Sequence, residues 1–275
     1  MSAGPAVSRP ARSILVTGAG GGLGGQTAQL FADRGWQVFA ADLRPPAPGR
    51  LLVPVTIDVT DSASVEQAAA DVESQSGDGL GAVVNFAGIL DVSALMDLSA
   101  ARLQRIIDIN VIGTHRVNQA FFGLVRRGHG RIVNISSEVG WQRALMMNGP
   151  YAITKHAVEA YSDALRRELM FLDVPVIVIQ PGPFRTDMTG GIESSFARAI
   201  DPASPFADLA RKVGRLAAKE KGHAHDPAVL AEVIWKAVNT PRPRARYSVR
   251  PDRRRVMLHR LPVPLADSAL RRMLR

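Results

Sequence analysis

The chain contains no cysteine, and this absence excludes several classes of protein. Without cysteine there is no disulfide scaffold, zinc finger, iron–sulfur site or cysteine nucleophile. Long apolar runs are also missing. The longest candidates, such as 174–179, have the length of a β-strand, whereas a membrane span needs about 18 consecutive apolar residues. Residues 1–13 lack the apolar segment of a secretory signal. We therefore expect a cytoplasmic protein whose residues 1–11 form a disordered lead.

Acidic residues are scarce in one part of the chain only. Residues 241–275 contain eleven arginines and two aspartates, so they carry the whole net charge of +9, and the preceding 240 residues are neutral. A neutral body argues against nucleic-acid binding over the main surface. Arginines alternate with apolar residues along 253–274. This pattern favours a terminal helix packed on the body or on another subunit, and leaves open peripheral contact with an anionic membrane.

The 275 residues, 46% of them hydrophobic and 21% charged, suit one large α/β domain. Short apolar segments alternate with helical ones, which predicts a parallel sheet covered by helices on both faces. The predicted strands are 14–16, 37–41, 51–57, 82–84, 131–135, 174–179 and 247–249. The predicted helices are 23–33, 62–74, 101–109, 111–127, 151–172 and 227–239. We expect a dinucleotide-binding and catalytic domain over 12–250, with a substrate-side insertion at 190–226 holding one or two helices, and a basic C-terminal extension over 251–275.

A glycine-rich segment follows the first predicted strand. Gly18, Gly22 and Gly24 lie between this strand and a helix, where glycines bring a pyrophosphate close to the backbone amides. Asp42 ends the second predicted strand, where a carboxylate binds ribose hydroxyls and repels a 2′-phosphate. The pattern favours NAD, but Arg44 lies two residues further on and keeps NADP open as the alternative.

Tyr151 and Lys155 are four residues apart at the start of a predicted helix and so share one face. A nearby ammonium and the helix N-terminus both favour the phenolate, which predicts a lowered pKa and an acid/base role for Tyr151. Ser137 ends the fifth predicted strand, where ligands bind in doubly wound sheets. Asn110 lies between two apolar helical segments.

These residues resemble the classical short-chain dehydrogenase/reductase family. The resemblance rests on the order and spacing of Thr17-Gly18-x-x-x-Gly22-x-Gly24, Asn85-Phe86-Ala87-Gly88, Asn110, Ser136-Ser137, Tyr151-x-x-x-Lys155 and Pro181-Gly182, and covers roughly residues 12–190. It implies a single-domain Rossmann fold with a doubly wound, seven-stranded sheet, a nicotinamide cofactor and a homodimer or homotetramer.

The resemblance also implies a role for each matching residue. Tyr151 exchanges a proton with the substrate oxygen, and Lys155 binds the nicotinamide ribose and lowers the tyrosine pKa. Ser137, preferred over Ser136, orients the substrate oxygen, and Asn110 supports a proton relay. The implied cofactor contacts are Gly18, Gly22, Leu23, Gly24, Asp42, Asp58, Val59, Asn85, Ala87, Gly88, Tyr151, Lys155, Pro181, Gly182 and Thr186. No metal site is predicted, since His223-Ala224-His225-Asp226 lacks spaced partners and indicates a surface turn.

The sequence departs from the family pattern in two places. Phe86 stands where a second asparagine is usual, and the segment from Ser137 to Tyr151 is one residue longer than is common. The expected substrate pocket is flanked by Met146, Met147, Phe184, Met188, Ile192 and Phe196, which are equally consistent with ordinary packing.

The C-terminal part resembles retinol- and hydroxysteroid-type members of the family. We therefore expect an NAD-dependent oxidoreductase that interconverts a secondary alcohol and a ketone, or an alcohol and an aldehyde. A hydrophobic lipid-, steroid- or retinoid-like substrate is favoured. The alternatives are an NADP-dependent carbonyl or ketoacyl reductase and a non-catalytic dinucleotide-sensing protein.

Overall fold

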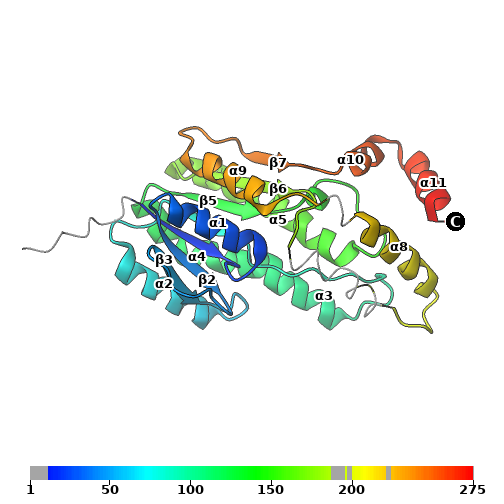
Figure 1. Cartoon of the computed structure of the whole chain (residues 1–275), viewed down its shortest axis with the longest axis horizontal. Helices are drawn as coiled ribbons and strands as arrows, with labels where there is room; N and C mark the ends of the chain where they lie inside the picture. The colour runs from blue at the N-terminus through cyan, green and yellow to red at the C-terminus, as the bar shows by residue number, and fades with distance from the viewer. Residues whose placement is uncertain (1–11, 187–195, 197–199, 221–223, 275) are drawn as a thin grey trace, which may run out of the picture.

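Seven parallel strands form the centre of the molecule in a computed structural model of the chain (Figure 1). The structure describes residues 12–186, 196, 200–220 and 224–274. The strands are β1 (Ser13–Thr17), β2 (Gln37–Asp42), β3 (Leu52–Thr56), β4 (Ala82–Asn85), β5 (Arg131–Ile135), β6 (Val176–Pro181) and β7 (Arg246–Val249). Their order is β3-β2-β1-β4-β5-β6-β7. The predicted doubly wound, seven-stranded sheet is therefore confirmed.

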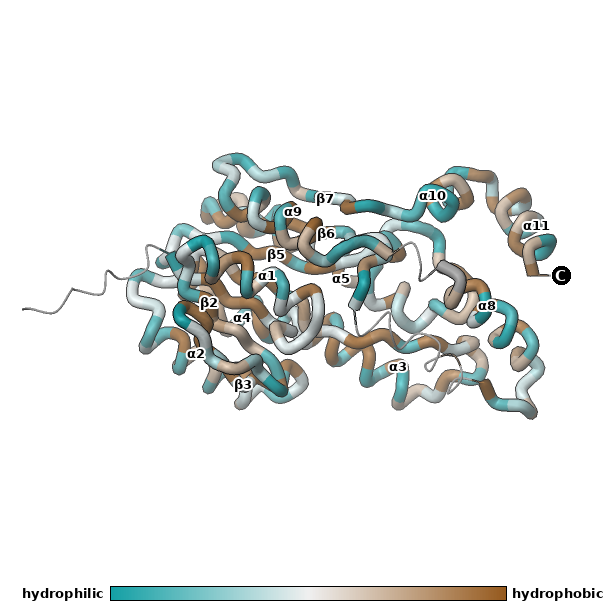
Figure 2. The backbone as a smooth tube through the Cα atoms, in the orientation of Figure 1, coloured by the Kyte–Doolittle hydropathy of each residue, from teal (hydrophilic) through white to brown (hydrophobic). Residues whose placement is uncertain are grey.

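Helices cover both faces of the sheet because the strands are apolar on both sides (Figure 2). The helices are α1 (Gly22–Asp33), α2 (Ser62–Ser76), α3 (Ala100–Ile107), α4 (Gly113–Arg127), α5 (Gly149–Leu169), α8 (Ala207–Glu220), α9 (Pro227–Asn239), α10 (Arg253–Arg260) and α11 (Val263–Leu274). On one face, Phe31 of α1 and Ile234 of α9 join the core of the sheet. On the other face, Val72 of α2, Phe121 of α4 and Leu169 of α5 do the same.

The order of the strands reverses between β1 and β4, and this topological switch point sets the place of the site. The segments that follow β1 and β4 diverge there, and those that follow β5 and β6 lie along the same edge of the sheet. Residues that end these strands therefore meet around one cavity, as the sequence predicted.

Several predicted helices differ from the observed ones at their ends, and two of the differences lie near the cavity. The helix expected over 111–127 begins at Gly113, because Asp108–Ile112 forms a π-helical turn between α3 and α4. The helix expected over 151–172 begins at Gly149, since Pro150 is tolerated in a first turn, and it ends at Leu169 before a 3₁₀ turn. Across the described ranges, no helix combines the length and apolarity needed to cross a membrane.

The C-terminal extension forms α10 and α11 beside the end of the sheet that carries the cavity (Figure 1). Lys212 of α8 donates a hydrogen bond from Nζ to the main-chain oxygen of Leu274 at 2.6 Å, which holds the end of α11 against α8. Helix α8 lies within the insertion expected at 190–226. The expected disordered lead, residues 1–11, lies outside the described residues.

Candidate active site

The glycine-rich segment after β1 approaches other backbone too closely for side chains. Gly18 has a φ of +69°, and a Cβ there would lie 2.8 Å from the main-chain nitrogen of Ala87. A Cβ on Gly24 would lie 2.2 Å from the main-chain oxygen of Gly18. The first turn of α1 follows Gly21, which has no side chain to cap it. These features fit a pyrophosphate held by the first amides of α1, as expected at Gly22 and Leu23.

Asp42 lies at the end of β2 with its carboxylate fixed beside the glycine-rich segment. Its Oδ2 accepts a hydrogen bond from the main-chain N–H of Gly20 at 3.1 Å, and its Oδ1 accepts one from the N–H of Arg44 at 3.0 Å. Asp42 lines the cavity, whereas the exposed Arg44 lies outside the cavity lining. The Asp42 carboxylate is therefore held at the edge of the sheet where a carboxylate of this fold accepts hydrogen bonds from ribose hydroxyls.

The expected adenine pair, Asp58 and Val59, also lines the cavity. Asp58 Oδ1 accepts hydrogen bonds from the N–H and hydroxyl of Thr60 at 2.9 and 2.7 Å, and these bonds hold the pKa of the Asp58 carboxyl below its usual value. The Arg116 charge acts in the same direction. Asp58 is therefore ionised at neutral pH, and its position is set by the turn that it caps.

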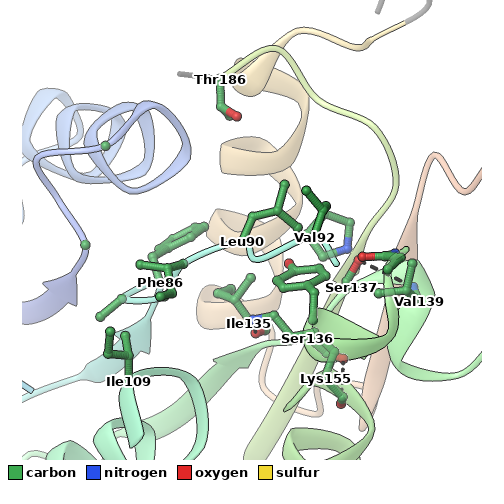
Figure 3. A pocket seen from close by; sticks show the side chains of 18 of the residues that line it. Phe86, Leu90, Val92, Ile109, Ile135, Ser136, Ser137, Val139, Lys155 and Thr186 are labelled. Carbon is green, nitrogen blue, oxygen red and sulfur yellow. Dashed lines mark hydrogen bonds between the residues drawn. The ribbon is translucent and has the colours of Figure 1, made fainter. Parts of the chain in front are cut away.

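Asn85 is the predicted cofactor residue that the structure places elsewhere. Its Nδ2 donates to Asn118 Oδ1 at 2.7 Å and to Asn134 Oδ1 at 2.9 Å, within a buried amide network. The side chain therefore ties β4 to α4 and β5 instead of lining the cavity. The next residues, Ala87 and Gly88, do line it. Pro181 and Gly182, which follow β6, and Thr186 line it as well, and Thr186 lies across the pocket from Lys155 (Figure 3).

Tyr151 and Lys155 lie on one face of α5, as their spacing predicted. The ammonium nitrogen of Lys155 is 5.5 Å from the centroid of the Tyr151 ring. The same Nζ donates a hydrogen bond to the main-chain oxygen of Ile135, at the end of β5, at 2.8 Å. Lys155 is 7% exposed, so its cation is held in a largely desolvated position beside the tyrosine ring.

The pKa of Tyr151 moves in the direction opposite to the one predicted from sequence. Burial raises the pKa of the Tyr151 phenol to about 12, a hydrogen bond with the Ser137 side chain opposes the rise, and the Glu138 charge adds to it. Burial also lowers the pKa of Lys155 to about 8, with Glu159 acting against this shift. The phenol is therefore neutral at pH 7, because desolvation outweighs the hydrogen bond with Ser137.

Ser137 and Ser136 are distinguished by the direction of their hydroxyls. The Ser136 hydroxyl donates to the main-chain oxygen of Lys155 at 3.5 Å in a buried position. Ser137 caps the 3₁₀ turn Glu138–Gly140 by accepting from the Val139 N–H at 3.4 Å (Figure 3). The Ser137 side chain is also hydrogen-bonded to Tyr151. The geometry therefore brings Ser137, the preferred residue of the two, next to the tyrosine.

Asn110 is held in the π-helical turn between α3 and α4 and is 1% exposed. Its side-chain oxygen accepts from the N–H of Ile89 at 2.8 Å, and its amide nitrogen donates to the oxygen of Ile89 at 2.9 Å. The amide also donates to Thr154 Oγ1 at 3.1 Å. Asn110 thus clamps the segment after β4 to α5, one turn from Tyr151.

The cavity that these residues line has a volume of about 1300 Å³. Its substrate side is mostly apolar and includes Leu90, Val92, Leu145, Met146, Phe184, Phe196, Val213 and Ala217. Figure 3 shows Leu90 and Val92 on the same side of the pocket as Ser137. Phe86, the departure from the usual asparagine, contributes a further apolar wall. Such a lining suits a large apolar ligand.

Some of the residues expected around the substrate do not line this cavity or lie outside the described structure. Met147 is 4% exposed and packs behind the lining, in an apolar cluster with Val92 and Phe196. Met188 and Ile192 lie outside the described residues.

Four charged residues at the cavity were not found by sequence reasoning, namely Arg105, Asp108, Glu138 and Arg255. Glu138 follows Ser137, and Arg255 comes from α10, within the C-terminal extension that we predicted as separate from the catalytic domain. The sequence holds no local pattern that joins these two residues. Arg255 therefore brings the extension expected over 251–275 to the cavity of the domain expected over 12–250.

Comparison with known proteins establishes the family. The short chain dehydrogenase family matches residues 12–195. Human retinol dehydrogenase 16 is 34% identical over 256 residues, which cover 86% of this chain and 79% of that protein. Human 17-beta-hydroxysteroid dehydrogenase type 6 is 37% identical over 190 residues, which cover 66% of this chain and 59% of that protein.

Solved structures agree with these relatives. A short-chain dehydrogenase from Streptomyces avermitilis superposes with a TM-score of 0.74 at 26% identity, over 96% of both chains. An actinorhodin polyketide ketoreductase with NADPH gives a TM-score of 0.71 at 25% identity, over 86% of this chain and 95% of that one. The chain belongs to the short-chain dehydrogenase/reductase family. It is an oxidoreductase of the family that uses NAD(P).

Proposed function

We propose that the protein is an NAD-dependent dehydrogenase that interconverts an alcohol and a ketone or aldehyde on a hydrophobic, lipid-, steroid- or retinoid-like substrate. The observation that carries this proposal is a single cavity with Tyr151, Lys155 and Ser137 on one side and apolar walls around them. The similarity to human retinol dehydrogenase 16 and to 17-beta-hydroxysteroid dehydrogenase type 6 supports the substrate class.

The proposed cofactor contacts follow the edge of the sheet. The amides at the start of α1 hold the pyrophosphate, Asp42 binds the adenosine ribose, and Asp58 with Val59 borders the adenine. Lys155 and Tyr151 bind the nicotinamide ribose, and Thr186 meets the carboxamide. Asn85 supports this site through the amide network instead of touching the cofactor. When bound, the nicotinamide supplies or accepts the hydride.

The proposed acid/base is Tyr151. During reduction its phenol donates the proton that the carbonyl oxygen gains, and a pKa of about 12 keeps this proton available at neutral pH. During oxidation the phenolate accepts the proton of the substrate hydroxyl. Ser137 orients the same oxygen, and the Lys155 cation stabilises the phenolate. Asn110 remains the proposed support of the proton relay, since it positions the main chain of Ile89 beside α5.

The remaining alternative is an NADP-dependent carbonyl or ketoacyl reductase, which the similarity to a ketoreductase with NADPH supports. A turnover screen distinguishes the dehydrogenase from this reductase. NAD(H) and NADP(H) are each tested with steroid, retinoid, acyl and small polar alcohols and ketones. The proposal predicts turnover of bulky apolar alcohols with NAD, and preferential turnover of acyl or polar ketones with NADPH would contradict it.

We also propose a homodimer or homotetramer in the cytoplasm. The proposal for assembly rests on the family, whose members are commonly oligomeric. Light scattering coupled to size-exclusion chromatography tests it, and a monomer at micromolar concentration would contradict it. Fractionation of cells that express the tagged full-length chain tests the location, and recovery of the protein with membranes would contradict it.

A further inference from the structure

The loop that follows Ser137 is attached to the first turn of the C-terminal helix α10. Glu138 is 4% exposed, and its Oε2 accepts a hydrogen bond from the main-chain N–H of Asp252 at 2.7 Å. Its Oε1 lies 3.5 Å from Nη1 of Arg255. One buried carboxylate, next in sequence to the serine of the site, therefore binds both the backbone and a side chain of α10.

The first turn of α10 holds Arg255 in place. Asp252 caps this helix by accepting from the N–H groups of Arg254 and Arg255 at 2.7 and 3.1 Å. Just before it, Arg250 has a φ of +53°, and a Cβ on Gly182 would lie 2.0 Å from the main-chain oxygen of Arg250. The segment from Arg250 to Arg255 therefore packs on the loop after β6 as well as on the loop after β5.

Further along, α10 binds the same loop a second time. Nδ1 of His259 accepts from the main-chain N–H of Arg143 at 3.1 Å, and the His259 ring meets that of Trp141 edge-on at 5.4 Å. The loop from Glu138 to Arg143 is thus held along its length by one helix. Ser137 caps the start of that loop, so the position of the Ser137 side chain depends on where α10 holds Glu138.

Three charged residues from three elements line the cavity that holds Tyr151. Lys155 approaches from α5, with Glu159 of the same helix acting on it. Glu138 approaches from the 3₁₀ turn, and Arg255 enters the cavity from α10. Asp252 caps α10 behind Arg255. Without a partner, the buried Glu138 carboxylate would destabilise the fold and would disfavour the phenolate form of Tyr151. The Arg255 guanidinium compensates this negative charge.

We propose that Glu138 and Arg255 form a positioning pair for the reaction, in which Arg255 neutralises and orients Glu138 while Glu138 fixes the Ser137 loop and sets the charge that Tyr151 experiences. This inference rests on the proposed function, because it assigns the acid/base to Tyr151. It makes the C-terminal extension part of the reaction site. Neither residue touches the reacting atoms, so both act through Tyr151 and Ser137.

The pH dependence of alcohol oxidation tests the pair, because its two members carry opposite charges. Glu138→Gln removes the negative charge but keeps an acceptor for the Asp252 N–H. The phenolate then forms more easily, and the limb on which kcat/KM rises with pH moves to lower pH by about half a unit or more. Arg255→Met leaves Glu138 uncompensated and moves the same limb to higher pH. Arg255→Lys keeps the positive charge, so its kcat/KM limb should lie at the same pH as that of the wild type.

Arg254→Met is the matched control, since Arg254 is exposed on the same turn of α10 and outside the cavity lining. Its pH profile should coincide with that of the wild type. Limbs that stay in place in both Glu138→Gln and Arg255→Met, with turnover lowered equally at every pH, would show a purely structural role and overturn the inference. Wild-type protein that turns over no alcohol or ketone would instead contradict the proposed function, and this inference with it.

Discussion

The ammonium of Lys155 donates a hydrogen bond to the main-chain oxygen of Ile135 at 2.8 Å, and this bond joins α5 to the end of β5. It places the cation beside the Tyr151 ring and at the end of β5, which Ser136 and Ser137 follow. The relationship explains how residues far apart in the chain share one site.

Lys155→Met should weaken both cofactor binding and turnover, because one ammonium serves the ribose and the tyrosine. We expect kcat/KM to fall by roughly 100-fold or more and the Kd for NADH to rise. The melting temperature should change little, since Glu159 keeps Arg246 and Gln180 as partners. Stopped-flow turnover and NADH fluorescence titration measure the two effects. Unchanged binding and rate in a folded variant would remove Lys155 from the site.

The pH dependence should differ between the two directions of the reaction. Oxidation needs the phenolate, and the raised pKa of Tyr151, about 12, makes that form scarce at neutral pH. The kcat/KM for oxidation should therefore rise with pH, about tenfold per unit at first. The lowered pKa of Lys155, about 8, means that its cation is present below this pH and lost above it, so the rise should flatten there.

Reduction uses the phenol, which persists throughout the range from about pH 6 to 10. Its kcat/KM should stay level at the acidic end and fall only as Lys155 loses its proton. Profiles in both directions with the same substrate pair provide the measurement. An oxidation rate that falls as the pH rises from about 6 to 8 would contradict the assignment.

Asp42→Asn should narrow the preference for NAD over NADP by at least about tenfold in kcat/KM. The amide keeps an acceptor for the Gly20 N–H but removes the charge that repels a 2′-phosphate. Arg44→Ala is the companion variant and should leave the KM for NAD unchanged, because Arg44 is exposed and outside the cavity lining. If the wild-type protein used NADP at least as efficiently as NAD, our interpretation of Asp42 would be wrong.

Removal of residues 256–275 should leave NADH binding within about twofold of the wild type while raising the KM for bulky apolar substrates. The sheet and the glycine-rich segment are complete before this point, but α10 would lose its contact between His259 and Arg143. The loop after Ser137 borders the substrate side, so it is the part expected to change. Titration with NADH and steady-state kinetics with a bulky and a small alcohol give the comparison.

The same truncation tests whether the extension also binds membranes or another subunit. Arg260, Arg271, Met257 and Leu265 are exposed in the removed segment, which suits an anionic surface. Vesicle binding that is lost at high salt would indicate the membrane, because salt screens exposed charges. A smaller assembly after truncation, without vesicle binding, would indicate a subunit contact. No change in kinetics or association would contradict a role for the extension.

The sequence predicted the parts of the site that depend on local spacing. Gly18 and Gly24 are required by backbone contacts within a short segment, and Tyr151 and Lys155 share a face because they are four apart on a helix. The parallel sheet followed from apolar strands that alternate with helices. These features arise from residues close together in the chain, which is why spacing alone indicates them.

The features that were missed arise from contacts between distant residues. In the π-helical turn, the side chain of Asn110 is held by hydrogen bonds to Ile89 and Thr154. The local sequence pattern does not indicate these contacts. The pairing of Glu138 with Arg255 likewise requires the C-terminal extension to return to the site. The pKa direction of Tyr151 was predicted wrongly because a nearby ammonium is visible in the sequence, whereas the extent of burial is not.

Replacement of Tyr151 by phenylalanine tests the central claim most directly. The ring stays in place and only the exchangeable proton is lost, so turnover should fall by about 100-fold or more while the Kd for NADH stays within about twofold. Tyr161→Phe is the matched control, because Tyr161 lies on the same helix with its hydroxyl near Asn118 and outside the cavity lining. It should keep turnover close to that of the wild type. A Tyr151→Phe protein that retains near-normal turnover would contradict the assignment of Tyr151 as the acid/base.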